Sequence, residues 1–281
     1  LAAAFEEDSP ASSKGRAGQI RDEVRVGFVG DAEQSELEAF LKEMPDRYVL
    51  GHPVDVIRRH ARDARDTRHL PIAVTIGPGP SPELAEVVVS SPDRPGLLAD
   101  VAAVLTAHRL AIASAEIYTR AKPDRNEAFD VFLVGREGRA LRVDASLGAK
   151  LTADLADLFE GKTTTEELLT RTPAQPAWAM RRSPDVPTEV IVDNEASTKF
   201  TVVDVFTKDR SGLLYTIART LREQGLSIAL SKVNTEGQRV SDVFYVEGPD
   251  GGKVREAGRL AEIQGALRGA IEAMDRQGNA R

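Results

Sequence analysis

The sequence Asp-Arg-Pro-Gly-Leu-Leu at residues 93–98 returns as Asp-Arg-Ser-Gly-Leu-Leu at residues 209–214. Each stretch follows a β-branched run and precedes apolar residues at helical spacing. Downstream, Asp-Val-Phe at 130–132 returns at 242–244, so the likeness persists well beyond the first motif. A repeat of this length is a small domain rather than one unit of a solenoid. The chain is therefore expected to contain two copies of one module.

The composition is that of a globular protein, with 41% apolar and 29% charged residues among 281. This length allows two compact domains and an additional segment. The absence of cysteine excludes disulfides and thiolate metal sites and fits a cytoplasmic location. A net charge of −7 argues against nucleic-acid binding, and no apolar run approaches the roughly 20 residues that cross a bilayer. The opening at Leu1 lacks an initiator Met and a basic flank, which indicates a fragment and not a signal peptide.

Residues 1–34 are polar and are expected to form a linker, and residues 35–70 are expected to form a helical connector. In the connector, Ser35 is a candidate N-cap and Pro45 separates two helices. The second helix carries five arginines, which are interpreted as a solvated face or as a surface for an acidic neighbouring domain. These are Arg58, Arg59, Arg62, Arg65 and Arg68.

Each copy of the repeat is predicted to form a strand, a helix, two strands joined by a turn, and a second helix. In the first copy these elements are expected at 84–90, 97–105, 110–119, 128–134 and 151–158. In the second copy they are expected at 199–207, 213–224, 227–235, 239–246 and 254–274. A capping-box pattern at 163–166 predicts a further short helix.

A ferredoxin-like sheet needs one more strand, and short β-branched stretches at 72–76 and 188–192 are predicted to supply it. Each precedes a turn-like segment and the first strand of its copy, so it can pair as a hairpin without a crossover. The same argument disfavours the alternative in which 188–192 closes the first copy. The expected fold is α+β, with two ferredoxin-like ββαββα modules that each begin with an edge strand. The boundaries place module one at 71–170, a linker at 171–187, module two at 188–275 and a tail at 276–281.

The repeated motif, set between a strand and a helix and followed by a hairpin ending in Asp-Val-Phe, resembles the ACT domain. Its doubling looks like the tandem ACT modules at the C-terminus of bifunctional PII uridylyltransferase/uridylyl-removing enzymes. The stretch at 40–60 resembles the segment that precedes those modules. The resemblance implies glutamine or another small amino acid as effector. It also implies a regulatory role in nitrogen metabolism, with the PII signalling protein and the enzyme's own catalytic domains as partners.

The catalytic motifs of that family are missing from this sequence. The family's nucleotidyltransferase domain holds magnesium with a Gly-Ser turn and a later Asp-x-Asp, and its hydrolase domain uses a His-Asp dipeptide. Neither pattern occurs here, and none of the histidines precedes an aspartate: His52, His60, His69 and His108. The chain is expected to be a regulatory region without catalytic residues, cofactor or metal. Magnesium is implied only for the absent catalytic domains.

The chemistry of the repeated corner suits a small zwitterion. Backbone amides at a helix start, reinforced by the helix dipole, favour a carboxylate, and glycine permits close approach or a positive φ. The ligand's ammonium group is expected at Asp93 or Asp209, and its side chain at polar groups of the following strand. The expected ligand-binding residues are Asp93, Arg94, Gly96, Leu97, Leu98 and Ser114 in the first copy and Asp209, Arg210, Ser211, Gly212, Leu213, Leu214, Ser231, Lys232 and Asn234 in the second.

Other interpretations stay open from the residues alone. The corners can be capped turns, with Asp93 and Asp209 as the caps. The protein can also be a stand-alone ACT-repeat protein for another amino acid, or an oligomerisation scaffold. If the corners bind, the second is expected to bind more tightly, because Ser211 keeps an amide that Pro95 lacks.

Overall fold

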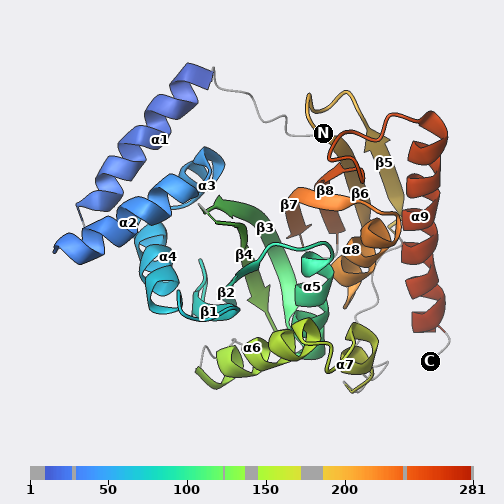
Figure 1. Ribbon diagram of the computed structural model, residues 1–281. Helices are drawn as coiled ribbons and strands as arrows, with labels where there is room; N and C mark the ends of the chain where they lie inside the picture. The colour runs from blue at the N-terminus through green and yellow to red at the C-terminus, as the bar shows by residue number, and fades with distance from the viewer. Residues whose placement is uncertain are drawn as a thin grey trace. The chain divides into compact units, whose positions relative to one another are not determined.

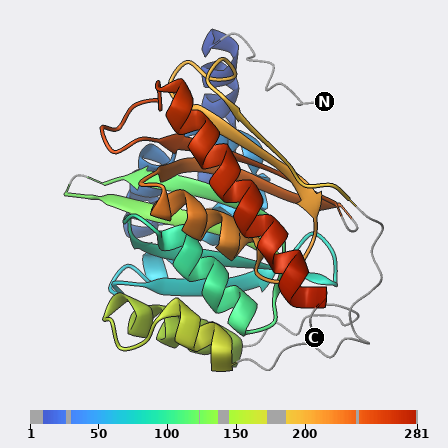
Figure 2. The same cartoon turned by 90° about the vertical axis from the view of Figure 1, so that its right-hand side faces the viewer.

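The computed structural model describes residues 10–26, 30–122, 124–136, 145–171, 186–236 and 239–279. Over these residues the chain forms one antiparallel sheet in the order β1-β2-β4-β3-β7-β8-β6-β5. Figure 2 shows helices α5, α8 and α9 lying in front of the strands on one face of that sheet. The strands are β1 (Ala73–Pro78), β2 (Leu84–Pro92), β3 (Ala111–Ala121), β4 (Asn126–Gly135), β5 (Glu189–Asp193), β6 (Thr201–Lys208), β7 (Ser227–Glu236) and β8 (Arg239–Glu247). The helices, labelled in Figure 1, are α1 (Pro10–Arg25), α2 (Asp31–Glu43), α3 (Asp46–Gly51), α4 (Val54–Asp66), α5 (Leu97–Ala107), α6 (Ala145–Phe159), α7 (Thr165–Arg171), α8 (Leu213–Glu223) and α9 (Ala257–Asn279).

The strand order confirms two ferredoxin-like modules, each with a leading edge strand. Strand β1 lies beside β2 at one end of the sheet, and β5 lies beside β6 at the other. The β5–β6 hairpin pairs Glu189 with Phe206 and Asp193 with Val202, so 188–192 does not close the first module. The prediction succeeded because a short β-branched run beside a tight turn pairs most easily with the strand that follows it.

The two modules join through their central strands. Strands β3 and β7 are antiparallel, with Ser114 opposite Asn234 and Glu116 opposite Lys232. Helices α5 and α8 pack against each other, and α5 is also covered by α6 and α7. Every residue of α5 from 97 to 105 is therefore buried, whereas α8 buries one side only. Each buried Leu, Ile or Val contributes about 1.5–3 kcal/mol relative to an exposed one, so this seam is a substantial part of the core.

The chain divides into two compact units, of which one contains helices α1–α4 with 90–92 and 118–129. Its centre is Tyr48, a fully buried ring that stacks on His52 with 4.6 Å between ring centroids. The edges of Phe40, Tyr118 and Phe129 pack around the same ring. The unit is therefore a layer of helices packed on residues 118–129.

Helix α1 corrects the expectation of a linker over 1–34. Ala17 and Val24 are fully buried, and the Arg58 side chain donates a hydrogen bond to the Val24 carbonyl at 3.1 Å. The local sequence is rich in Ser and Gly and is a weak helix former by itself, so the helix depends on these tertiary contacts. Helix α2 begins at Asp31 with Gly30 as the N-cap residue, which also corrects the assignment of Ser35.

Three of the five arginines at 58–68 have partners in the helical unit, and Arg62 and Arg68 are exposed. Arg58 donates to carbonyls of α1, Arg65 lies 2.5 Å from a carboxylate oxygen of Glu33, and Arg68 pairs with Glu36. Arg59 and Arg62 also interact within the chain. The ion pairs with α2 were not predicted, whereas the exposed Arg62 and Arg68 fit a solvated face and a surface for a neighbouring domain stays a prediction.

Three smaller expectations are revised or lie outside the described residues. The capping box is formed one residue later than expected, since the Thr164 amide donates to Glu167 Oε2 at 3.0 Å and the Glu167 amide to Thr164 Oγ1 at 3.2 Å. Helix α9 continues to Asn279, into the segment assigned to a tail. Most of the linker at 171–187 lies outside the described residues.

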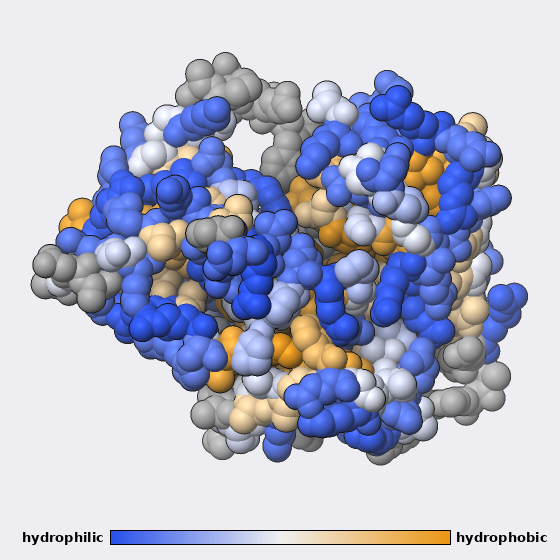
Figure 3. Space-filling model, in the orientation of Figure 1, coloured by the Kyte–Doolittle hydropathy of each residue, from blue (hydrophilic) through white to orange (hydrophobic). Residues whose placement is uncertain are grey.

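The face drawn in Figure 3 is mainly hydrophilic, with smaller hydrophobic areas between the hydrophilic ones. Large apolar side chains that are well exposed in the described chain are Val26, Leu70 and Ile191. No helix in the described ranges has the length and apolar character needed to span a membrane. The described residues also contain no cluster of three or more His, Asp or Glu side chains that could hold a metal ion.

Candidate functional site

The two Asp-Arg-x-Gly corners have the same backbone geometry. Gly96 has φ 88° and ψ 1°, and Gly212 has φ 79° and ψ 9°. The Leu97 amide donates to the Arg94 carbonyl at 3.2 Å, and the Leu213 amide to the Arg210 carbonyl at 3.1 Å. These values are those of a type II β-turn with glycine at its third position, where a side chain is strained. The glycine is therefore required by the turn.

The turn uses some of the amides that the sequence assigned to a ligand. The Leu97 and Leu213 amides close their own turns, so they are not available to a bound carboxylate. The amides of Leu98 and of its counterpart Leu214 follow in the first helical turn, where no intrahelical acceptor exists. The four leucines themselves are buried, as expected for core residues. Ser211 lies in the second turn between Arg210 and Gly212, at the position of Pro95.

Neither corner is capped by its aspartate, which corrects one of the alternatives. The N-cap residues of α5 and α8 are Gly96 and Gly212, which have no side chain that could form a cap hydrogen bond. Asp93 and Asp209 lie earlier, where the strands β2 and β6 have just ended. The aspartates therefore precede the turns and are not the N-cap residues of these helices.

The two arginines of the repeated motif point into their own modules. Arg94 forms an ion pair with Asp100, and its guanidinium carbon lies 3.8 Å from the centroid of the Phe159 ring. Arg210 donates to Thr207 Oγ1 at 2.8 Å and forms an ion pair with Asp275 at 2.5 Å. Both side chains therefore hold the corner onto the adjoining helices. Their direct role in ligand binding stays a prediction.

The predicted strand residues are divided between the two faces of the sheet. Ser231 is 2% exposed and lies on the same side as the buried Val233, towards the helices, whereas Lys232 and Asn234 are exposed on the other face. Ser114 shares that other face because it is directly opposite Asn234. Side chains alternate along a strand, so a ligand at a helix start can reach Ser231 but not these three. The Ser231 hydroxyl has no hydrogen-bond partner among the described residues.

A buried acid lies beneath the second module's helices. Asp242 is 2% exposed, and its carboxylate accepts a hydrogen bond from the Asn234 amide at 3.2 Å. Burial raises the pKa of Asp242 to about 8, and the nearby negative charge of Asp209 adds to the increase. The second module thus places two acids close enough to interact, and a proton on Asp242 relieves their repulsion.

The sequence did not single out the residue that faces each glycine from the other module. A Cβ on Gly96 would come within 2.6 Å of Arg222 Cδ, at the end of α8. A Cβ on Gly212 would lie 3.7 Å from Thr106 Cγ2, at the end of α5. Thr106 and Arg222 are 116 positions apart, the same offset as the two motifs (209 − 93). The offset of the repeat makes Thr106 and Arg222 equivalent positions. Only the packing of α5 against α8 shows that each of them faces the glycine of the other module.

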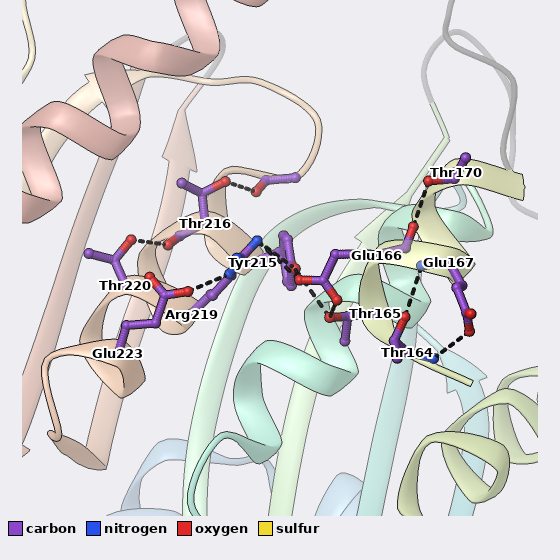
Figure 4. Close-up of polar contacts among 11 residues, drawn as sticks. Thr164, Thr165, Glu166, Glu167, Thr170, Tyr215, Thr216, Arg219, Thr220 and Glu223 are labelled. Carbon is purple, nitrogen blue, oxygen red and sulfur yellow. Dashed lines mark hydrogen bonds and ion pairs between the residues drawn. The ribbon is translucent and has the colours of Figure 1, made fainter. Parts of the chain in front are cut away.

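Helix α7 adds a polar connection between the modules at this seam (Figure 4). The Tyr215 hydroxyl lies 3.2 Å from Thr165 Oγ1 and donates to Glu166 Oε1 at 3.3 Å. Arg219 also lies 3.2 Å from Glu166 Oε1. The backbone amide of Glu166 itself, at the helix start, lowers the pKa of this carboxyl.

Comparison with known families decides what these modules are. Residues 85–146 match the family described as "ACT domain", and residues 189–274 match the one described as "ACR9-like, ACT-like domain". The chain carries two ACT domains. The matched ranges coincide with the strands and helices around the two corners, so the repeated motif and the fold lead to the same assignment.

The ACT pair and the helices before it are homologous to the C-terminal region of larger enzymes. The chain is 33% identical over 91% of its length to a "Bifunctional uridylyltransferase/uridylyl-removing enzyme" of Rhodospirillum rubrum. Proteins with the same name from Gluconobacter oxydans and Azospirillum brasilense are 31% and 32% identical, over 94% and 90% of the chain. The chain spans about a quarter of the length of these relatives, at 27%, 27% and 26%.

Proposed function

We propose that the ACT pair senses glutamine and regulates uridylyltransferase and uridylyl-removing activities that act on the PII protein. The observation that carries this proposal is the pair of glycine corners, each of which faces a helix of the other module. It is supported by the homology of nearly the whole chain to enzymes that bear both activities in their name. The activities themselves belong to other parts of such an enzyme.

The corner has the groups that an amino acid needs. The α-carboxylate can accept hydrogen bonds from the free amides at the helix start, where the helix dipole also favours a negative charge. The ammonium group fits the acids beside the corner, Asp93 or Asp209. A carboxamide side chain offers both a donor and an acceptor to further polar groups.

Regulation follows if the amino acid prefers one arrangement of the modules. A ligand shifts an equilibrium only by the difference in its affinity for the two states. A ligand at a corner would touch α5 and the end of α8 together, so it would favour the arrangement in which these helices are packed. The seam between the modules is therefore the element that glutamine stabilises.

Isothermal titration calorimetry of the whole chain with glutamine tests the proposal. We expect saturable binding that a panel of other amino acids, including glutamate and asparagine, does not match. Gly96→Val is expected to weaken binding at least tenfold, because valine is strained at φ 88° and its side chain would collide with Arg222. Gly265→Val in α9 is the matched control, since a Cβ there meets nothing within 4 Å.

The control separates loss of the site from general loss of stability. Circular dichroism and thermal unfolding of both variants show whether the fold persists. A folded wild-type chain that gives no heat with glutamine or with any amino acid of the panel would contradict sensing and leave the paired modules as a scaffold.

A further inference from the structure

The two corners of the ACT pair are unequal in charge. At the first corner, Arg222 of α8 lies on Gly96, with Nη1 2.7 Å from the position of a Cβ. At the second corner the equivalent contact is the methyl group of Thr106, at 3.7 Å. The next polar position also differs, because the buried Asp100 of α5 corresponds to Thr216 of α8. The first corner thus has charged groups where the second has hydroxyl groups.

The charge of Arg222 has no close partner within the described chain. Its guanidinium forms no hydrogen bond and no ion pair within 4 Å to any residue that the structure describes, although it acts at longer range on Asp100. Asp100 is already paired with Arg94, so it does not neutralise a second arginine at close range. A cation with no close anion therefore lies at the first corner.

The surroundings of this cation favour an anion beside it. The start of α5 carries a partial positive charge from the helix dipole and from its unpaired amides. Arg222 is exposed, so water screens its repulsion from that start, and Glu166 of α7 is near enough to affect Asp100 without pairing with Arg222. A carboxylate between the guanidinium and the amides would replace this repulsion with two attractive interactions.

We infer that Arg222 binds the α-carboxylate of the amino acid held at the first corner, and that this corner is the stronger of the two. The inference rests on the proposed function and adds a specificity-determining residue from the second module. It reverses the order expected from Ser211 and Pro95, because a charge-assisted hydrogen bond exceeds one additional backbone amide. The ligand is then held by the turn of one module and the helix end of the other.

Calorimetry with two probes on the whole chain tests this role. L-glutamine carries the α-carboxylate, and L-glutaminamide replaces it with a neutral carboxamide. Arg222→Ala is expected to weaken glutamine binding by about ten- to a hundredfold, the usual effect of losing a hydrogen bond to a charged group. The affinity for glutaminamide, already low, should change by less than threefold. Arg222→Lys should recover part of the glutamine affinity, since it restores charge without the planar fork.

Two further variants make the result specific. Thr106→Ala alters the equivalent position at the second corner and is expected to change the main glutamine affinity by less than threefold. Arg268→Ala removes an exposed arginine from α9 and should bind glutamine as the wild type does. Thermal unfolding without ligand should be unchanged in Arg222→Ala, because the side chain is exposed and makes no close ion pair.

Each other outcome overturns the inference in a distinct way. Equal loss in Arg222→Ala and Thr106→Ala would make the corners equivalent. Tighter glutamine binding by Arg222→Ala would make Arg222 a plug that competes with the ligand. Equal losses for glutamine and glutaminamide would place Arg222 away from the carboxylate. Absence of amino-acid binding in the wild type would instead contradict the proposed function itself.

Discussion

Asp242→Asn is expected to be more stable than the wild type at pH values above 3.8, the ordinary pKa of this carboxyl, by an amount that grows as the pH rises towards 8. The buried carboxyl has its pKa raised from 3.8 to about 8, mainly by burial. Between these values the folded protein keeps a proton that the unfolded chain has released. The free energy of unfolding of the wild type therefore falls by about 1.4 kcal/mol for each pH unit in this window.

The asparagine variant removes this slope and keeps the local hydrogen bond. Its side-chain oxygen can still accept from the Asn234 amide, which now bonds to Asp242 at 3.2 Å. Urea unfolding of both proteins at pH 5, 6.5 and 8 measures the difference in stability. Below the pKa of the unfolded carboxyl the two proteins should be nearly equally stable, since the aspartic acid is then neutral in both states. Equal slopes from pH 5 to pH 8 would show that Asp242 is ionised in the folded protein.

Tyr48→Ala is expected to destabilise the helical unit by about 3–5 kcal/mol, the usual cost of truncating a buried aromatic residue. The Tyr48 side chain is fully buried and its ring contacts rings from α2, α4 and the β3–β4 strands. Its removal would leave a cavity that helices on several sides cannot all close. Amide hydrogen exchange of α2–α4 measures the effect directly, because local opening of this unit speeds exchange there.

Tyr48→Phe is the matched control for this cavity. It keeps the ring and removes the hydroxyl, which lies 2.7 Å from Nδ1 of the buried His60. The expected loss is about 1–3 kcal/mol, the cost of removing one partner of a buried hydrogen bond. If the alanine and phenylalanine variants exchanged at the same rate, the hydrogen bond and not the packing of the ring would hold the unit together.

Part of the candidate site could be predicted from the sequence because it depends on local chemistry. Gly96 and Gly212 follow a strand and precede an amphipathic helix, and only glycine takes the positive φ of that turn without strain. The side-chain partners could not be predicted in the same way. Arg94 and Arg210 turned inwards because Asp100 and Asp275 lie on helices whose packing no local pattern specifies.

In the N-terminal region, by contrast, tertiary contacts and not the local sequence decide the structure. Helix α1 has little intrinsic helical preference, and residues such as Val24 become informative only when the helices α2–α4 surround them. The ion pairs of Arg65 with Glu33 and of Arg68 with Glu36 could not be predicted either, because the partners are some thirty residues apart in the sequence. Contacts of this range are invisible to a periodicity argument.

The sequence by itself determined that the chain is a duplicated α+β module, because a repeat in register preserves both the alternation of its strands and the turn between its first strand and helix. It also determined that each module begins with an edge strand, since a hairpin is the shortest route to the fourth strand. Only the tertiary structure decided that β3 pairs with β7 and that Arg222 lies on Gly96. These contacts join residues more than a hundred positions apart, and their formation depends on how two nearly identical surfaces pack, which the repeat alone does not specify.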